Sequence, residues 1–151
     1  KRRDYSRVVD ARNPIVAHEY LGASVEGKDV FVADDIISSG DSVLDIAENV
    51  KARRANRFFA YATYAIFTNG LEKFDKAYEQ GLIDGIFGSN LTYLNPELRN
   101  RPWFHEVDVS KYIAYFISAL NHDVSISSLL DPLLQKRALD RAKYIDEQLS
   151  L

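Results

Sequence analysis

The sequence predicts an α/β fold in which a mostly parallel sheet is flanked by helices. Short apolar runs, typical of buried strands, alternate with segments whose apolar residues recur every three or four positions, as on one face of a helix. The alternation continues over most of the 151 residues, a length that fits one ordinary domain. Strands that alternate with helices indicate βαβ units, in which consecutive strands run parallel.

Five segments have the composition of strands. The clearest is 30–33, a continuous apolar run typical of a buried strand. Before it, the basic segment 1–7 lacks periodicity and predicts a loop or mobile arm. The chain between the last two strands contains Pro96 and Pro102 and is expected to be irregular. The expected strands are 15–20, 30–33, 58–64, 83–87 and 104–107.

Helical periodicity follows three of these strands. The first helix is expected to begin at Asp41 or Ser42, either of which is a suitable N-cap. The second spans 69–80 and ends before Gly81, where a C′ glycine is favoured. The third spans 109–120 and is clearly amphipathic.

The carboxyl-terminal tail has a different pattern. From Pro132 onward, apolar residues recur at spacings of three and four among many charges, and proline suits the first turn of a helix. A helix packed on its own domain and an oligomerisation helix both fit this pattern. The apolar positions are Leu133, Leu134, Ala138, Ala142, Ile145 and Leu149.

Composition excludes several classes of protein. Nineteen Lys and Arg against 22 Asp and Glu give a net charge of −3, which argues against nucleic-acid binding through a general basic field. The absence of cysteine excludes disulfides and thiolate metal sites. The apolar runs are too short to span a membrane, so we expect a cytoplasmic protein. Because the chain starts at Lys1 and contains no Met, we expect a piece or an engineered version of something longer.

Candidate site chemistry is concentrated in residues 34–42, between the second predicted strand and the helix after it. Parallel sheets of this class bind ligands at the carboxyl ends of their strands. The oxygens of Asp34 and Asp35 suit sugar hydroxyl groups or Mg²⁺, and the helix amino terminus suits a phosphate. The segment therefore predicts a sugar-phosphate pocket. The alternative is an ordinary polar loop in which Asp34 caps a turn.

This segment also resembles a known signature. Residues 32–42 are similar to the motif of type I phosphoribosyltransferases: an apolar strand, two acids, two apolar residues, an acid and Thr-Gly-Gly-Thr. Further segments resemble ribose-phosphate diphosphokinases (PRPP synthetases), including their flexible catalytic loop and hairpin arm. These segments are 1–3, 26–30, 107–111 and 126–129. The resemblance implies that 1–130 is the C-terminal half of such an enzyme and that 131–151 is a helical extension.

The resemblance implies an activity and a set of site residues. The family transfers pyrophosphate from ATP to ribose 5-phosphate with Mg²⁺, which gives PRPP and AMP. It implies that Asp34 and Asp35 hold the ribose hydroxyls, and that Lys1 and Arg3 are catalytic-loop residues that close over ATP. The implied ribose 5-phosphate residues are Asp34, Asp35, Ser38, Ser39, Gly40, Asp41 and Ser42.

Two positions depart from the family motif. Ser38 stands where the motif has its third acid, and Asp41 stands in place of the second glycine of the phosphate loop. A carboxylate beside a phosphate is unfavourable unless it turns away, for example to cap the helix at Ser42 and Val43. Phosphate affinity is therefore the property that these departures affect.

Parts of the family's chain are not found in this sequence. Three parts of the family's chain have no counterpart here: the N-terminal half, which supplies much of the ATP site, the first strand of the C-terminal half, and the pyrophosphate loop. We expect this half, or another chain, as a partner, and self-association into a homo-oligomer. We also expect an exposed sheet edge where the first strand would pair. We hypothesise that the tail helix covers apolar surface that the missing parts would otherwise cover.

Two alternative functions remain open. They are a base phosphoribosyltransferase and a non-catalytic sugar-phosphate-binding or assembly module.

Overall fold

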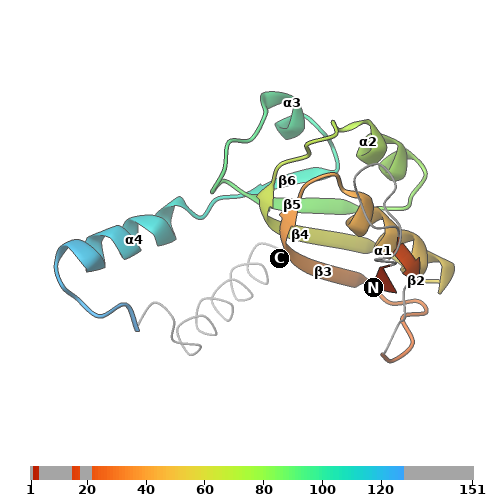
Figure 1. Ribbon diagram of the computed structural model, residues 1–151, viewed down its shortest axis with the longest axis horizontal. Helices are drawn as coiled ribbons and strands as arrows, with labels where there is room; N and C mark the ends of the chain where they lie inside the picture. The colour runs from red at the N-terminus through yellow and green to blue at the C-terminus, as the bar shows by residue number, and fades with distance from the viewer. Residues whose placement is uncertain (1, 4–14, 18–21, 128–151) are drawn as a thin grey trace, which may run out of the picture. The chain divides into compact units, whose positions relative to one another are not determined.

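The computed structural model describes residues 2–3, 15–17 and 22–127 (Figure 1). The chain divides into two compact units, Lys1–Val107 and Asp108–Leu151. The tail from Pro132, with its expected helix, lies outside the described residues. The domain boundary at residue 130 adjoins that region and stays a prediction.

The first unit is built on a parallel sheet of four strands in the order β3-β4-β5-β6 (Figure 1). Every neighbouring pair is parallel, and helices connect successive strands. This arrangement confirms the predicted α/β fold. The strands are β3 Val30–Ile37, β4 Phe58–Ala65, β5 Gly85–Ser89 and β6 Phe104–Val107, and the helices are α1 Asp41–Ala52, α2 Glu72–Glu79 and α3 Pro96–Arg99.

A second, small sheet lies near the amino terminus. Strand β1 (Arg2–Arg3) pairs antiparallel with β2 (Ile15–Ala17). The prediction of a loop over residues 1–7 is therefore wrong at Arg2 and Arg3, because a pairing partner far along the chain converts an unpatterned segment into a strand. The strand expected over 15–20 is confirmed for its first three residues, and the remainder lies outside the described residues.

The core lies between α1, α2 and one face of the sheet. Along β4, Phe58, Ala60 and Ala62 are buried whereas the residues between them are only half-buried, as the two-residue repeat of a strand requires. The helices bury their apolar stripes against that face through residues such as Val43 and Phe74. The Trp103 side chain is fully buried and contacts the rings of Phe74 in α2 and Phe104 in β6.

Several boundaries differ from the sequence-based expectations. Strand β3 continues to Ile37, four residues beyond the predicted end. Helix α2 begins at Glu72 rather than residue 69, because Gly70 adopts a positive φ of 81° that no helix contains. Helix α3 was not expected; the Asn95 side chain accepts a hydrogen bond from the Glu97 N–H at 3.0 Å and caps this single turn.

The second unit contains helix α4, Ser110–Asn121, which confirms the third predicted helix. The Asp108 carboxylate accepts a hydrogen bond from the Ser110 N–H at 2.9 Å, immediately before the first turn. After the helix, Asp123 adopts a positive φ of 52°, which ends the helical path.

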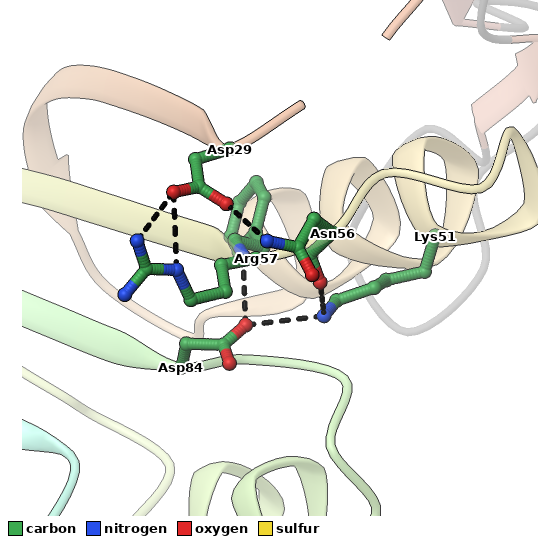
Figure 2. Close-up of polar contacts among 6 residues, drawn as sticks. Asp29, Lys51, Asn56, Arg57 and Asp84 are labelled. Carbon is green, nitrogen blue, oxygen red and sulfur yellow. Dashed lines mark hydrogen bonds and ion pairs between the residues drawn. The ribbon is translucent and has the colours of Figure 1, made fainter. Parts of the chain in front are cut away.

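The amino ends of β3, β4 and β5 are joined by two carboxylates (Figure 2). Asp84 accepts hydrogen bonds from the Phe58 N–H at 2.8 Å and from Lys51 Nζ at 3.1 Å. Asp29 accepts hydrogen bonds from Arg57 and from Asn56 Nδ2, the latter at 2.8 Å. These contacts fix the starts of three strands and the end of α1 in one cluster.

The Asp84 contacts lead to a stability prediction. In the variant Asp84→Ala the Phe58 N–H loses its partner in a part-buried position, so we expect the free energy of unfolding to fall by about 1–3 kcal/mol. Asp84→Asn keeps an acceptor oxygen for this N–H and should lose less. Urea denaturation followed by circular dichroism measures both variants, and equal losses would contradict the role given to the Phe58 hydrogen bond.

The Asp29 contacts lead to a pH prediction. Hydrogen bonds from Arg57 lower the pKa of the Asp29 carboxyl below its ordinary value of 3.8, although burial acts in the opposite direction. A carboxylate with a lowered folded-state pKa stabilises the protein above the unfolded-state pKa, and this contribution is lost as pH falls through the folded-state value. NMR titration should place Asp29 below 3.8 and show its pKa rising in Arg57→Gln. An unchanged pKa in that variant would refute the assignment.

Candidate functional site

Asp34 and Asp35 lie within β3 rather than in a loop after it. The expectation that both follow the strand is wrong: both side chains are exposed, and β3 lies at the edge of the sheet formed by the described residues, where a strand tolerates carboxylates. Consecutive residues of a strand point to opposite faces, so the two carboxylates do not form a converging pair. Asp34 Oδ1 instead accepts a hydrogen bond from the Asp35 N–H at 2.9 Å.

The segment 38–40 connects β3 to α1 at the carboxyl end of the sheet. Gly40 is the N-cap of α1, with a left-handed φ of 82°, and its carbonyl accepts a hydrogen bond from the Leu44 N–H at 3.0 Å. Asp41 and Ser42 are therefore the first two helical residues, and the expectation that one of them is the N-cap is wrong. A glycine occupies this position because side chains rarely adopt the left-handed conformation.

Asp41 is turned toward its neighbours in the loop and in α2. Its Oδ2 accepts a hydrogen bond from Ser39 Oγ at 2.8 Å, and its Oδ1 accepts one from Lys73 Nζ at 2.6 Å. Ser38 Oγ lies 3.2 Å from Thr68 Oγ1 in the segment after β4. The loop is thus tied to two later segments of the chain by polar contacts.

Gly40 also lies against the ring of Phe74 in α2. A Cβ added at Gly40 would lie 2.3 Å from Phe74 Cε2, well inside van der Waals contact. Behind this ring, Trp103 stacks on Phe74 with ring centroids 5.4 Å apart. The Asp75 carboxylate accepts a hydrogen bond from Trp103 Nε1 at 2.8 Å and holds the indole in place. The packing of Phe74 and Trp103 therefore fixes how closely the β3–α1 loop approaches α2.

The remaining predicted site residues are Lys1, Arg3 and Ser42. Lys1 lies outside the described residues, and Arg3 belongs to the small amino-terminal sheet. Ser42 is the second residue of α1 and is half-buried.

A cavity of about 410 Å³ lies at the carboxyl ends of β4 and β5. Its lining includes Phe67, Glu72, Tyr93 and Arg101. Because Thr68 contacts Ser38, this cavity and the β3–α1 loop occupy neighbouring positions along the same edge of the sheet. The described part of the chain contains no cluster of three or more side chains suited to metal ligation. Within it, no helix is long and apolar enough to cross a membrane.

Comparison with known proteins gives a consistent set of relatives. The chain is 29% identical over 131 residues to the ribose-phosphate pyrophosphokinase of Vibrio cholerae, which covers 87% of this chain and 38% of that protein. It is 27% identical over 125 residues to the enzyme of the same name from Shewanella oneidensis, covering 81% and 39%. This chain is similar to ribose-phosphate pyrophosphokinases. It spans less than two-fifths of the length of these relatives, and no protein-family model matches it.

A solved structure supports the same fold. The chain superimposes on phosphoribosylpyrophosphate synthetase from Mycobacterium smegmatis with a TM-score of 0.59 at 16% identity, covering 68% of this chain and 33% of that chain. The likeness to a ribose-phosphate pyrophosphokinase thus extends to the fold of the parallel sheet and its helices.

Sequence reasoning did not find the residues that α2 contributes. Lys73 and Phe74 are distant from residues 38–42 in the sequence, and no motif in α2 connects them to the loop. Gly40 was the one hint of this contact, because a glycine before a helix often marks a place where another group approaches the backbone closely. Only the packing of α2 on the sheet shows which group approaches.

The contact between Gly40 and Phe74 leads to a paired prediction. Gly40→Ala places a side chain on a residue with a left-handed backbone conformation, and the added methyl group overlaps the Phe74 ring. We therefore expect the free energy of unfolding to fall by about 2 kcal/mol or more. Gly27→Ala is the control, because Gly27 has a φ of 68° but nothing within 4 Å of an added Cβ; its loss should be about 1 kcal/mol. Thermal unfolding compares them, and equal losses would show that the ring contact is unimportant.

Proposed function

We propose that this chain is the ribose 5-phosphate-binding part of a ribose-phosphate pyrophosphokinase, corresponding to the C-terminal half of that enzyme. The complete enzyme would transfer pyrophosphate from ATP to ribose 5-phosphate and release PRPP and AMP. The observation that carries this proposal is the similarity to these enzymes over 87% of the chain. Because the alignment covers 131 of the 151 residues, it includes the segment 34–42 whichever residue it starts from.

The loop geometry supports the phosphate half of this proposal. The amino terminus of α1 presents N–H groups and the positive end of the helix dipole at the carboxyl edge of the sheet. Gly40 lets the backbone approach a ligand closely, and the turn carries the hydroxyl groups of Ser38, Ser39 and Ser42. The Ser39 hydroxyl would have to leave Asp41 Oδ2 to donate to a phosphate. The 5-phosphate would bind at this turn.

The acids of β3 support the sugar half. Within the described residues, the Asp35 carboxylate and Asp34 Oδ2 accept no side-chain or backbone hydrogen bond, and both residues are exposed. Their oxygens would accept hydrogen bonds from the 2- and 3-hydroxyls of ribose. Because the two side chains leave the strand on opposite faces, we expect unequal contributions from them.

The oxygens of Asp34 and Asp35 also suit Mg²⁺, the cation that the proposed reaction requires. No three protein ligands converge among the described residues, and the two acids lie on opposite faces of β3, so one of them would hold the ion together with substrate oxygens and water, as is common for Mg²⁺. The bound ion would neutralise charge on the phosphate groups. The protein's own contribution is to position the sugar hydroxyls and the 5-phosphate.

The remaining parts of the proposal concern what lies beyond the described loop. Lys1 and Arg3 would close over ATP, and the rest of the ATP site would come from the missing half or from another chain. We also propose that the protein self-associates. The isolated chain would bind ribose 5-phosphate without completing the reaction.

A non-catalytic sugar-phosphate-binding or assembly module is the second candidate. It is favoured by Asp41, whose carboxylate occupies the phosphate loop and already accepts a hydrogen bond from Ser39. An assay for AMP release from ATP and ribose 5-phosphate, with the remaining part of a pyrophosphokinase chain restored, separates the two. AMP formation supports the enzyme, and its absence from a folded, substrate-binding protein supports the module.

Calorimetric titration with ribose 5-phosphate and Mg²⁺ tests the binding proposal directly. We expect saturable binding by the chain and its loss in Asp34→Ala combined with Asp35→Ala, because the ribose hydroxyls lose their acceptors. Glu48→Ala combined with Glu79→Ala is the control, since it removes two exposed carboxylates outside the proposed site. Equal affinity in the two double variants would refute the assignment of the acids.

A further inference from the structure

Lys73 brings a positive charge to the candidate phosphate loop from another part of the chain. It is the second residue of α2, and its Nζ lies 2.6 Å from Asp41 Oδ1, in the first turn of α1. Both side chains are about half-exposed, at 49% for Lys73 and 44% for Asp41. The ammonium group therefore lies where a ligand at the amino terminus of α1 would meet it.

The charges around this loop call for such a cation. Asp34, Asp35 and Asp41 place three carboxylates along β3 and the first turn of α1, and the ligand proposed above carries a phosphate. Like charges at short range oppose binding, whereas an ammonium group forms strong charge-assisted hydrogen bonds with phosphate oxygens. The Lys73 ammonium group contacts the loop through Asp41.

The placement of Lys73 is fixed by the packing of its neighbour. Phe74 lies directly against Gly40 and is fully buried beneath Trp103. The backbone of α2 is thus held against the loop one residue after Lys73, so the ammonium group stays within reach of Asp41. An ammonium group also has three N–H donors, more than its contact with Asp41 uses.

Stability alone is a poor explanation for this ion pair. Half-exposed pairs contribute little to folding because water screens them and two long side chains must be ordered. We propose that Lys73 is a phosphate-binding residue of the β3–α1 loop, and that Asp41 holds its ammonium group at the loop when no phosphate is bound. This proposal rests on the function proposed above and adds a ligand-binding residue supplied by α2.

A double-mutant cycle tests the proposal. Lys73→Met, Asp41→Asn and their combination are titrated with ribose 5-phosphate and Mg²⁺, with ribose, and with inorganic phosphate. We expect Lys73→Met to raise the Kd for ribose 5-phosphate and for phosphate roughly tenfold in both the parent and the Asp41→Asn background. Ribose affinity should not change, because ribose has no phosphate. Lys76→Met is the control, since Lys76 is an exposed lysine later on the same helix.

The Asp41→Asn background gives the decisive comparison. If Lys73 served only to neutralise Asp41, its removal would have no effect once Asp41 is uncharged, and that result would overturn the proposal. Circular dichroism and thermal unfolding confirm that each variant is folded.

The titrations also separate this proposal from the proposed function. Binding of ribose 5-phosphate that depends on Asp34 and Asp35 but not on Lys73 leaves the function standing and overturns the role of Lys73. Ribose 5-phosphate binding that depends on Lys73 but is unchanged in Asp34→Ala combined with Asp35→Ala supports Lys73 and overturns the sugar-binding part of the proposed function. A folded chain that binds neither phosphate nor ribose 5-phosphate overturns both.

Discussion

The carboxylate of Asp84 is the interaction on which the arrangement of the sheet depends. It accepts the Phe58 N–H at the start of β4 and the ammonium group of Lys51 in the last turn of α1, while the Asp84 N–H donates to the Phe58 carbonyl. One residue thereby links the start of β4, the start of β5 and the end of α1. Because the strands are parallel, the loops that follow them lie together at the other, carboxyl edge of the sheet.

At the carboxyl edge of the sheet, the candidate site depends on the packing of α2 as much as on the sequence motif of residues 34–42. Helix α2 supplies the Phe74 ring that fixes Gly40, and the Lys73 ammonium group that meets Asp41. Aspartate at the position where the related motif has glycine would otherwise oppose an anion. The contact with Lys73 balances this charge locally, so a departure in one segment is matched by a residue distant in the sequence.

The regular elements agree closely with the sequence pattern, because each has a strong local signal. Helices α1 and α4 and strands β4 and β6 follow from apolar periodicity, and Gly81 takes the positive φ of 66° expected of a C′ glycine. The extension of β3 through Asp34 and Asp35 had no such signal. Carboxylates are disfavoured in strands by local preference, but pairing with β4 overrides that preference in an edge strand.

The sequence by itself determined the α/β class, the order of the four parallel strands with helices α1, α2 and α4, and the segment that carries polar chemistry, because periodicity and composition are local properties. Tertiary structure decided how that segment is used. It placed Asp34 and Asp35 inside a strand, made Gly40 the N-cap in place of Asp41 or Ser42, and brought Lys73 to the loop. These outcomes depend on which distant residues pack together, and no local pattern in residues 34–42 contains that information.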